Sequence, residues 1–299
     1  MNFQYDVVLL TEGQYVNPVT IDWYVDQVLT EDRLVAEALE KRGLKVLKTN
    51  WDNPLFDWSS TRCVLLRTTW DYSGRFPEFS AWLQKVSQQT RVINPIEQVY
   101  WNIDKHYLLD LGAEGVPIPP THIVEPKTST SLKALQAKLG WEEMVLKPAI
   151  SAGGRHTYRL NKDNLEAHEA IFQELILEEA LLLQPFLYNI INKGEVALMV
   201  IGGKVTHGVI KRAKKGDFRV QDDFGGSVAL HRPDTEEIAL AEQAVAACAE
   251  MPLYARVDMV WNNDNQLVLS EIELIEPEMW FRHCPNAADA LADCIAQTL

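Results

Sequence analysis

The sequence predicts an α/β lobe at the front of the chain, followed by α+β structure. Over residues 1–95, short apolar runs alternate with segments of helical periodicity, which is typical of strands and helices that build a small parallel sheet. From Leu181 onward the apolar runs follow one another across short turns, which favours antiparallel hairpins. These two patterns define the expected fold class.

In the front lobe, Gly43 ends the first predicted helix and Pro95 stops the last predicted strand, because glycine favours helix ends and proline cannot donate to a sheet. The predicted strands are Tyr5–Leu10, Leu44–Lys48, Cys63–Arg67 and Arg91–Asn94, and the predicted helices are Glu31–Arg42 and Phe79–Val86. Their alternation indicates a parallel order for the sheet.

Behind the front lobe, the loop Gly115–Pro120 separates helical from extended structure, because its prolines block a helix. Helices are predicted at Asp104–Leu111, Ser131–Leu139, Thr235–Ala249 and Asn286–Gln297. Extended segments are predicted at Thr121–Val124, Met144–Lys147, Arg155–Leu160, Glu195–Ile201, Val205–Lys211, Ala255–Trp261 and Leu267–Ile275. The pair Gly202-Gly203 forms the turn of one hairpin.

The composition excludes several classes of protein. The chain has 299 residues, with 28 Lys and Arg against 42 Asp and Glu, and its net charge of −14 argues against a nucleic-acid partner. The N-terminus does not read as a signal peptide, and no apolar run reaches the roughly 18 residues of a membrane helix. Four cysteines without a C-x-x-C pair indicate reduced thiols, so we expect a cytoplasmic protein without a membrane partner.

A glycine-containing loop lies between two extended segments. Lys147 ends the first of these segments, and Ser151, Gly153 and Gly154 follow it. Adjacent glycines let backbone N–H groups approach an anion, and a lysine beside them supplies a point charge. The loop is therefore a candidate flap over phosphates, with a plain hairpin turn as the alternative.

Three carboxylates are predicted on one face of the last hairpin. A two-residue turn at Asn263-Asp264 places Asp258 opposite Leu269 and makes Glu271 its diagonal neighbour, with Glu273 projecting from the same face. Such a group needs a neutralising cation, and carboxylate oxygens beside phosphates are the usual ligands of Mg²⁺. The alternative is a solvated polar face.

The acidic chain also contains a basic cluster, with five cations in the nine residues Lys211–Arg219. One interpretation is an electrostatic clamp for a polyphosphate or a developing oxyanion, and the other is a solvated loop. A further candidate is Arg67, which follows a buried strand where α/β sheets place ligands and can bind a carboxylate. Its alternative role is a structural pair with Asp71, with Trp70 as packing.

The order of lysine strand, glycine flap, basic loop and carboxylate hairpin resembles the ATP-grasp superfamily, in particular members like glutathione synthetase and the ribosomal-protein glutamate ligases. The resemblance covers about two thirds of the chain, from about Asn94 onward. It implies an α/β front lobe plus an α+β ATP-grasp fold, with ATP held between two α+β lobes. The implied domains are 1–95 for the substrate lobe, 96–187 for the central lobe and 188–299 for the C-terminal lobe.

The resemblance also implies roles for individual residues. The ATP-binding residues implied are Lys105, Lys147, Ser151, Gly153, Gly154, Gln184, Phe186, Leu187, Glu195 and Lys211. The implied magnesium ligands, which can also suit Mn²⁺, are Asp258, Glu271 and Glu273, and the implied catalytic arginine near the transferred phosphate is Arg219. The sequence departs from the family pattern at two positions, with Gln184 where glutamate is common and Glu273 where asparagine is usual.

The implied activity is an ATP-dependent carboxylate–amine ligase that activates a small amino acid or peptide as an acyl phosphate. Arg256 shares a strand face with Asp258 and is a candidate oxyanion stabiliser, and Arg67 and Asp71 are candidate substrate contacts. The Arg-Thr-Thr-Trp-Asp-Tyr element at 67–72 is similar to one in the cyclo-ligases of D-cycloserine biosynthesis, so intramolecular cyclisation is an alternative. A non-catalytic nucleotide-binding protein is a further alternative, and a homodimer is compatible with the resemblance.

Overall fold

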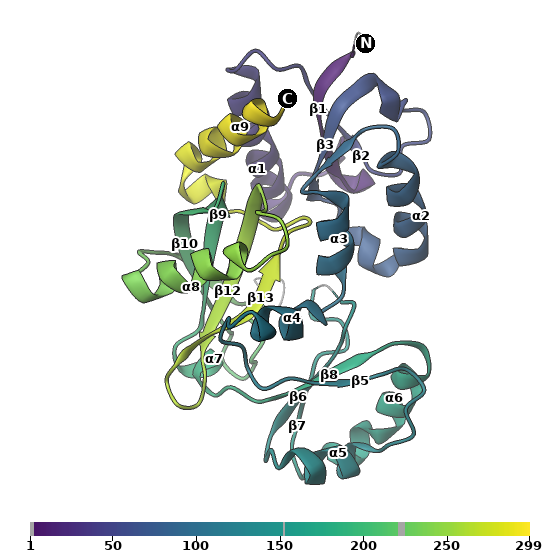
Figure 1. Cartoon of the computed structure of the whole chain (residues 1–299), viewed down its shortest axis with the longest axis vertical. Coiled ribbons are helices and arrows are strands. Elements are labelled where there is room, and N and C mark those ends of the chain that lie inside the picture. Colours follow the sequence, from purple (N-terminus) through teal and green to yellow (C-terminus); the bar gives the residue numbers. More distant parts are fainter. Residues whose placement is uncertain (1–2, 152, 221–224) are drawn as a thin grey trace.

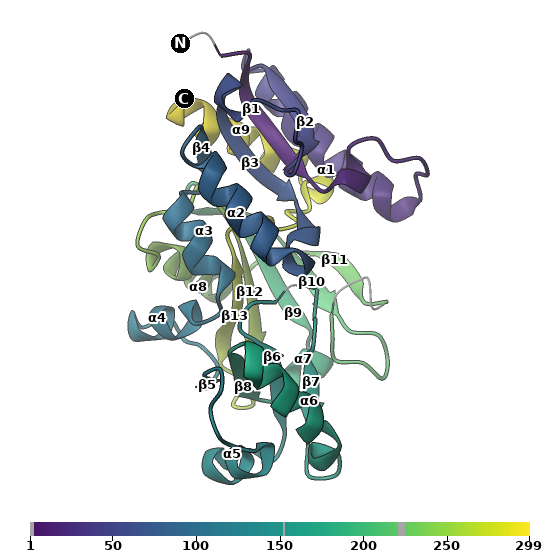
Figure 2. The same cartoon turned by 90° about the vertical axis from the view of Figure 1, so that its right-hand side faces the viewer.

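The computed structural model describes residues 3–151, 153–220 and 225–299 and arranges them around three sheets (Figure 1). The front lobe lies at one end, together with both chain termini, and the central lobe lies at the other end in both views (Figures 1 and 2). Within the described ranges, no helix is both long enough and apolar enough to cross a membrane.

The front lobe contains the predicted parallel sheet, with strand order β2-β1-β3-β4. Its strands are β1 (Tyr5–Thr11), β2 (Val46–Asn50), β3 (Thr61–Thr68) and β4 (Arg91–Ile93), and its helices are α1 (Trp23–Glu40) and α2 (Phe76–Val86). Helix α1 begins eight residues before the predicted start because Asp22 caps it, accepting hydrogen bonds from the N–H groups of Tyr24 and Val25. Short 3₁₀ turns occur at Gly13–Tyr15, Trp58–Ser60 and Trp70–Gly74.

The central lobe is built on an antiparallel sheet of order β5-β8-β6-β7. Its strands are β5 (His122–Val124), β6 (Met144–Pro148), β7 (Tyr158–Leu160) and β8 (Leu181–Pro185), and its helices are α5 (Leu132–Leu139) and α6 (Leu165–Glu178). Strands β6 and β7 pair directly, which confirms that the glycine loop joins two strands. Helix α6 and strand β8 have no counterpart among the elements predicted from the sequence.

The third sheet is antiparallel, with order β11-β10-β9-β12-β13. Its strands are β9 (Glu195–Ile201), β10 (Lys204–Arg212), β11 (Ser227–His231), β12 (Tyr254–Trp261) and β13 (Leu267–Glu273). Around it lie α7 (Asn189–Asn192), α8 (Thr235–Ala246), a 3₁₀ turn at Phe281–His283 and α9 (Pro285–Thr298). Strand β9 is apolar on both faces because Ala197 and Met199 pack in the core that contains α9, while Val196 and Leu198 pack in the core that contains α8.

The register of the β12–β13 hairpin differs from the predicted one. Trp261 pairs with Leu267, so the connection is residues 262–266, an odd number of residues where the predicted turn has an even number. This difference alone would turn Glu271 to the opposite face from Asp258. A bulge between Asp258 and Met259 skips Ser270 and restores the common face. Asp258 therefore lies directly opposite Glu271, which corrects the predicted diagonal arrangement.

The front lobe and the third sheet share one core. Strand β1 and helix α1 contribute to the same apolar cluster as β9 and α9, and Arg42 after α1 binds Asp289 and Asp293 of α9 at 3.1 and 2.6 Å. Helices α3 (Ile96–Ile103) and α4 (Tyr107–Ala113) pack with the front-lobe core and the third-sheet core, respectively. The division of the chain into 1–95, 96–187 and 188–299 stays a prediction. The packing of α3 and α4 associates residues 96–113 with the front lobe and the third sheet.

Asn94 connects the front lobe to the third sheet. Its side-chain amide donates to the carbonyl oxygens of Tyr254 and Leu274 at 2.9 and 2.8 Å, and its oxygen accepts from the Leu253 N–H at 2.7 Å. The residue is fully buried, so these three groups have no access to replacement water.

We therefore expect Asn94→Ala to lower the free energy of unfolding by roughly 2–4 kcal/mol, because it leaves buried peptide groups without partners. Chemical denaturation followed by circular dichroism measures this change. The exposed Asn192, at the end of α7, provides the control substitution Asn192→Ala, for which we expect little change. Equal midpoints for the two variants would contradict the assigned role of Asn94.

Candidate active site

A cavity of about 420 Å³ lies between the central sheet and the third sheet and extends to the front lobe. Strands β6 and β8 contribute one wall and strands β12 and β13 the other, and the glycine loop borders it. Most of the residues singled out from the sequence line this cavity: Lys105, Lys147, Ser151, Gly153, Gly154, Gln184, Phe186, Leu187, Glu195, Lys211, Arg219, Arg256, Asp258, Glu271 and Glu273.

The three predicted metal ligands form a cluster. Asp258 is buried, Glu271 and Glu273 are partly buried, and each offers a carboxylate oxygen within 4.8 Å of the others. Three converging carboxylate oxygens beside phosphate-binding groups suit a hard divalent cation such as Mg²⁺. The donor set therefore fits the predicted metal.

Opposing charges give the two glutamates different acidities. Burial opposes ionisation of Glu271, but Lys105 and Lys147 lower the pKa of its carboxyl to about 2. Burial raises the pKa of Glu273 to about 7, with Glu271 and Asp258 adding to the shift and Arg256 opposing it. A cation bound between these groups would remove the repulsion among them.

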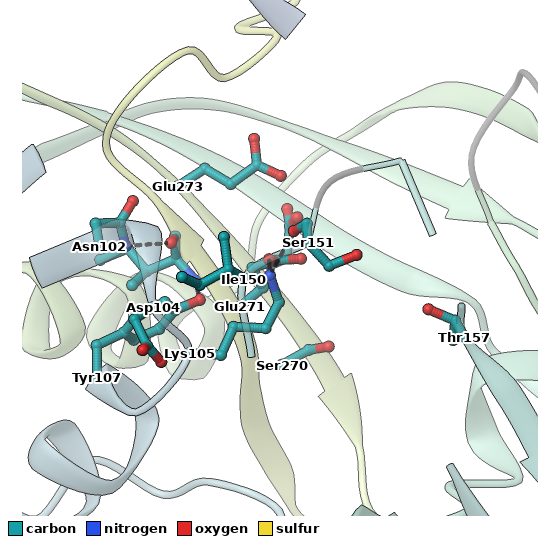
Figure 3. Close-up of polar contacts among 12 residues, drawn as sticks. Asn102, Asp104, Lys105, Tyr107, Ile150, Ser151, Thr157, Ser270, Glu271 and Glu273 are labelled. Atoms are coloured by element: carbon teal, nitrogen blue, oxygen red, sulfur yellow. Dashed lines mark hydrogen bonds and ion pairs between the residues drawn. The ribbon is translucent and has the colours of Figure 1, made fainter. Parts of the chain in front are cut away.

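Two lysines flank the cluster, Lys105 from the turn between α3 and α4 and Lys147 from β6. The Lys105 ammonium contacts Glu271 at 3.0 Å and donates to the Ser151 carbonyl at 2.9 Å, so it connects β13 to the glycine loop (Figure 3). The Lys105 N–H also donates to the Ala149 carbonyl at 3.0 Å, which fixes the start of the α4 turn. Burial and the neighbouring Lys105 lower the pKa of Lys147. Both lysines thus face the region where negative charge is expected.

A chain of charges crosses the third sheet from Glu195 to Asp258. The Lys211 ammonium lies 2.5 Å from Glu195, its direct cross-strand partner, and 3.1 Å from Asp258. Gly194 allows this approach, because a Cβ there would lie 2.4 Å from the Lys211 carbonyl oxygen and its φ is +92°. Burial opposes the charge of Lys211, but Asp258 and Glu195 raise its pKa, so it stays protonated.

Arg256 lies at the centre of the carboxylate cluster. Its guanidinium donates to Asp258 at 2.9 and 3.0 Å, contacts Glu273 and lies 5.3 Å from the ring centroid of Trp280. Register places Arg256 directly opposite Glu273, just as Asp258 is opposite Glu271. The guanidinium can therefore stabilise an oxyanion at this end of the cavity.

The flap loop and the basic cluster lie on the cavity rim. The Ser151 hydroxyl donates to the Arg155 carbonyl at 3.1 Å, and Gly153 and Gly154 have positive φ angles of 59° and 69°. Of the five cations between 211 and 219, Lys211 and Arg219 line the cavity, and Arg219 binds Asp217 at 2.7 Å. The basic cluster is thus only partly directed to the site.

The segment 183–187, which the resemblance to the ATP-grasp superfamily implies as the hinge that holds the adenine, has an apolar wall. The ring of Phe186 lies edge-on to Phe218 with centroids 5.7 Å apart, which suits a flat aromatic base. The main chain of Phe186 is already engaged, because its N–H donates to Glu143 and its carbonyl accepts from Asn263. The Gln184 side chain donates to the Thr121 hydroxyl at 2.9 Å, and the Arg159 guanidinium lies 3.8 Å from the centroid of the buried Phe186 ring.

Arg67 and Asp71 are not among the residues that line this cavity, and their contact with substrate stays a prediction. Arg67 is 1% exposed, its Nε lies 3.8 Å from the Asp32 carboxylate, and its guanidinium faces the Phe281 ring. Asp71 accepts from the Trp51 indole at 2.8 Å and binds Arg75 at 2.7 Å. The alternative of a structural ion pair between Arg67 and Asp71 is replaced, because each side chain has a different partner.

The end of the cavity beside the front lobe was not predicted from the sequence. Tyr24, Trp70, Tyr72 and Glu276 line it, and the Trp70 indole donates to the Glu276 carbonyl at 3.1 Å. Burial and the nearby Glu273 raise the pKa of the Glu276 carboxyl to about 8, although a hydrogen bond with Tyr72 opposes the shift. The motif at 67–72 was a signal for this region, through Trp70 and Tyr72 rather than Arg67.

Two family models match the chain side by side. Residues 7–94 match the N-terminal domain of the D-cycloserine synthetase DcsG, and residues 114–277 match the ATP-grasp domain of prokaryotic glutathione synthetase. The cycloserine biosynthesis protein DcsG of Streptomyces lavendulae is 31% identical over 278 residues, which cover 88% of this chain and 92% of that protein.

Solved structures agree with these matches. The crystal structure of D-cycloserine synthetase DcsG superposes with a TM-score of 0.85 at 27% identity, covering 98% of this chain and 99% of the other. A RimK-domain ATP-grasp protein from Sphaerobacter thermophilus has a TM-score of 0.66 at 19% identity, with 98% and 99% covered. D-alanine–D-alanine ligase from Bacillus anthracis has a TM-score of 0.66 at 16% identity, with 98% and 97% covered, and these last two show the fold alone.

The position of Glu276 predicts a pH-dependent stability. Because its folded pKa of about 8 exceeds the ordinary value of 4.5, the native state holds a proton that the unfolded state has lost between these pH values. The contribution of this carboxyl is therefore complete below pH 4.5 and is lost as the pH rises to 8. We expect Glu276→Gln to be more stable than the parent by up to roughly 4 kcal/mol at pH 8.5, and equal to it near pH 4.5.

Denaturation of the ligand-free protein across this pH range measures the difference. The matched control is Glu174→Gln, because Glu174 is an exposed carboxylate on α6. A stability gap for Glu276→Gln that stays constant with pH would contradict the prediction.

Proposed function

The chain belongs to the ATP-grasp ligases, which use ATP to form C–N bonds, and we propose that it closes a ring within a small amino-acid derivative, as in D-cycloserine formation. One observation carries the nucleotide part of this proposal: Lys105, Lys147 and the three-carboxylate cluster converge in one cavity beside a glycine loop. The ring-closing part is supported by the match of the front lobe to the DcsG N-terminal domain.

The nucleotide is proposed to lie along the cavity from the hinge to Arg256. The base stacks in the apolar region of Phe186 and Phe218, near Leu187 and Gln184, and Glu195 receives the ribose hydroxyls. The phosphates extend beneath Ser151, Gly153 and Gly154, where backbone N–H groups and the ammonium groups of Lys105 and Lys147 neutralise them. Lys211 completes this set of charges by holding Glu195 and Asp258 in place.

Asp258, Glu271 and Glu273 are the residues proposed to hold Mg²⁺. When bound, the ion would offset the charge of the phosphates and polarise the phosphoryl group for transfer. Glu273 in place of the usual asparagine adds a carboxylate, and Arg256 directly opposite offsets it. The alternative of a non-catalytic protein depended on Glu273 alone, and the place of Glu273 within the cluster gives no support to it.

The proposed reaction has two steps. A carboxylate oxygen of the substrate attacks the γ-phosphorus of ATP, and the bond from this phosphorus to the bridging oxygen breaks. ADP is the leaving group, and the substrate becomes an acyl phosphate. The amine at the other end of the same molecule then attacks the acyl carbon, forms the C–N bond, loses a proton and displaces inorganic phosphate. Arg256 and Arg219 stabilise the charges that develop on the transferred phosphoryl group and on the tetrahedral oxyanion.

Trapping with hydroxylamine tests the activation step. The purified protein is incubated with Mg·ATP, hydroxylamine and a pool of amino acids and their side-chain amine derivatives, and hydroxamates are identified by mass spectrometry. We expect a hydroxamate with hydroxylamine present, and a product lighter than its substrate by one water without it. A product that joins two molecules would favour intermolecular ligation, and the absence of any hydroxamate or ADP release would overturn the proposal.

We expect Glu271→Gln to lower Mg·ATP turnover by about 100-fold or more, because it removes one of three anionic metal ligands beside the phosphates. ADP release in the presence of the activated substrate measures turnover. Glu174→Gln serves again as the matched carboxylate-to-amide control. Full turnover of Glu271→Gln with unchanged dependence on Mg²⁺ would refute the metal assignment.

A further inference from the structure

The cavity has a second end that the proposed nucleotide does not fill. Tyr24 of α1 and the residues Trp70, Tyr72 and Ser73 of the 3₁₀ turn at 70–74 line this end from the front lobe, and Glu276 lines it from the segment after β13. Tyr24 packs against Trp70 with ring centroids 6.4 Å apart. Aromatic side chains and the Glu276 carboxylate thus line the same end of the cavity.

Glu276 differs from the other buried carboxylates of the cavity in its partners. Among the described residues, no lysine, arginine or histidine nitrogen lies within 4.0 Å of it, whereas each carboxylate of the metal cluster contacts a lysine or an arginine. Glu278 also differs from it, since Glu278 binds Arg282 at 2.5 Å. Glu276 is 8% exposed, and a hydrogen bond from Tyr72 orients its carboxylate.

A buried carboxylate without a cation is costly, and aromatic faces attract cations. A positively charged ligand would neutralise the carboxylate and would also be attracted by the aromatic faces. A primary ammonium group has the required size, charge and three donors for the carboxylate and the rings. An anionic group at this end would instead be repelled by Glu276.

We propose that Glu276 binds the ammonium group of the amino-acid substrate, and that Tyr24, Trp70 and Tyr72 enclose this group. The inference rests on the proposed function, since it names the part of the substrate that this end of the cavity recognises. It also sets the orientation of the substrate. Glu276 lines the same cavity as Glu273 and Arg256, so an ammonium bound here places the carboxylate of a small amino acid toward the proposed phosphoryl-transfer groups.

Two ring compounds that differ only in the amine test this assignment. D-cycloserine carries the primary amine, and isoxazolidin-3-one is the same ring without it. Calorimetry measures the binding of each compound to the protein saturated with Mg·ADP. We expect the parent to bind D-cycloserine about tenfold or more tightly than the ring without the amine, since a charge-assisted hydrogen bond is at stake.

Glu276→Gln should abolish this preference by weakening the binding of D-cycloserine about tenfold and leaving the binding of isoxazolidin-3-one unchanged, because the amide keeps the shape and loses the charge. Glu276→Asp should retain part of the preference, because it keeps the charge on a shorter arm. Unchanged binding of Mg·ADP shows that both variants are folded, and Glu174→Gln is the matched control.

The outcomes separate the two proposals. If the parent binds both rings equally, or if Glu276→Gln keeps the full preference for the amine, the assignment of Glu276 is overturned while the proposed function stands. If the parent binds neither ring but binds Mg·ADP, the ring-closing function itself is overturned, and the assignment that rests on it falls too.

Discussion

The buried carboxylate of Asp258 is the constraint on which the rest of the site depends. It is 1% exposed and is stable only because Lys211 approaches from β10 and Arg256 from its own strand. Each of these cations reaches a second carboxylate, Glu195 or Glu273, so charge compensation extends across the third sheet from β9 and β10 to β12 and β13. The network holds the acidic groups in place before any ligand binds. This is preorganisation, which lowers the cost of assembling a polyphosphate site.

The sequence specifies the elements of this site better than their pairing. Apolar runs identify β9, β10, β12 and β13 because residues of these strands pack in the cores of one sheet. The bulge at Ser270 carries no signal, since serine neither requires nor forbids it, and the common face of Asp258 and Glu271 was reached through an incorrect register. The helix at 165–178 was missed although it packs in the central core.

Long-range pairing explains the remaining differences. Arg67 follows a strand in the way a ligand-binding residue does, but Asp32 from α1 and the Phe281 ring lie close to it in the folded chain. Glu276 is visible in the sequence as one acidic residue among several near 271–278, whereas its lack of a cation is a property of the packing. Local spacing does not reveal that Asp32 and Phe281 lie beside Arg67, or that Glu276 has no cationic partner among the described residues.

The distribution of hydrophobic cores has a consequence for how substrates enter. The central lobe has a core of its own and also contributes Ala149 and Leu182 to the third-sheet core, whereas the front lobe and the third sheet are joined through α1, α9 and Asn94. The front lobe and the third sheet therefore form one body, against which the central lobe packs. The front lobe and third sheet carry Glu276, Arg256 and the predicted metal ligands. The central lobe carries Lys147, the glycine loop and Phe186. If the central lobe moves to release ADP, the residues proposed to hold the amino acid can keep their mutual positions, because they all lie on the front lobe and the third sheet.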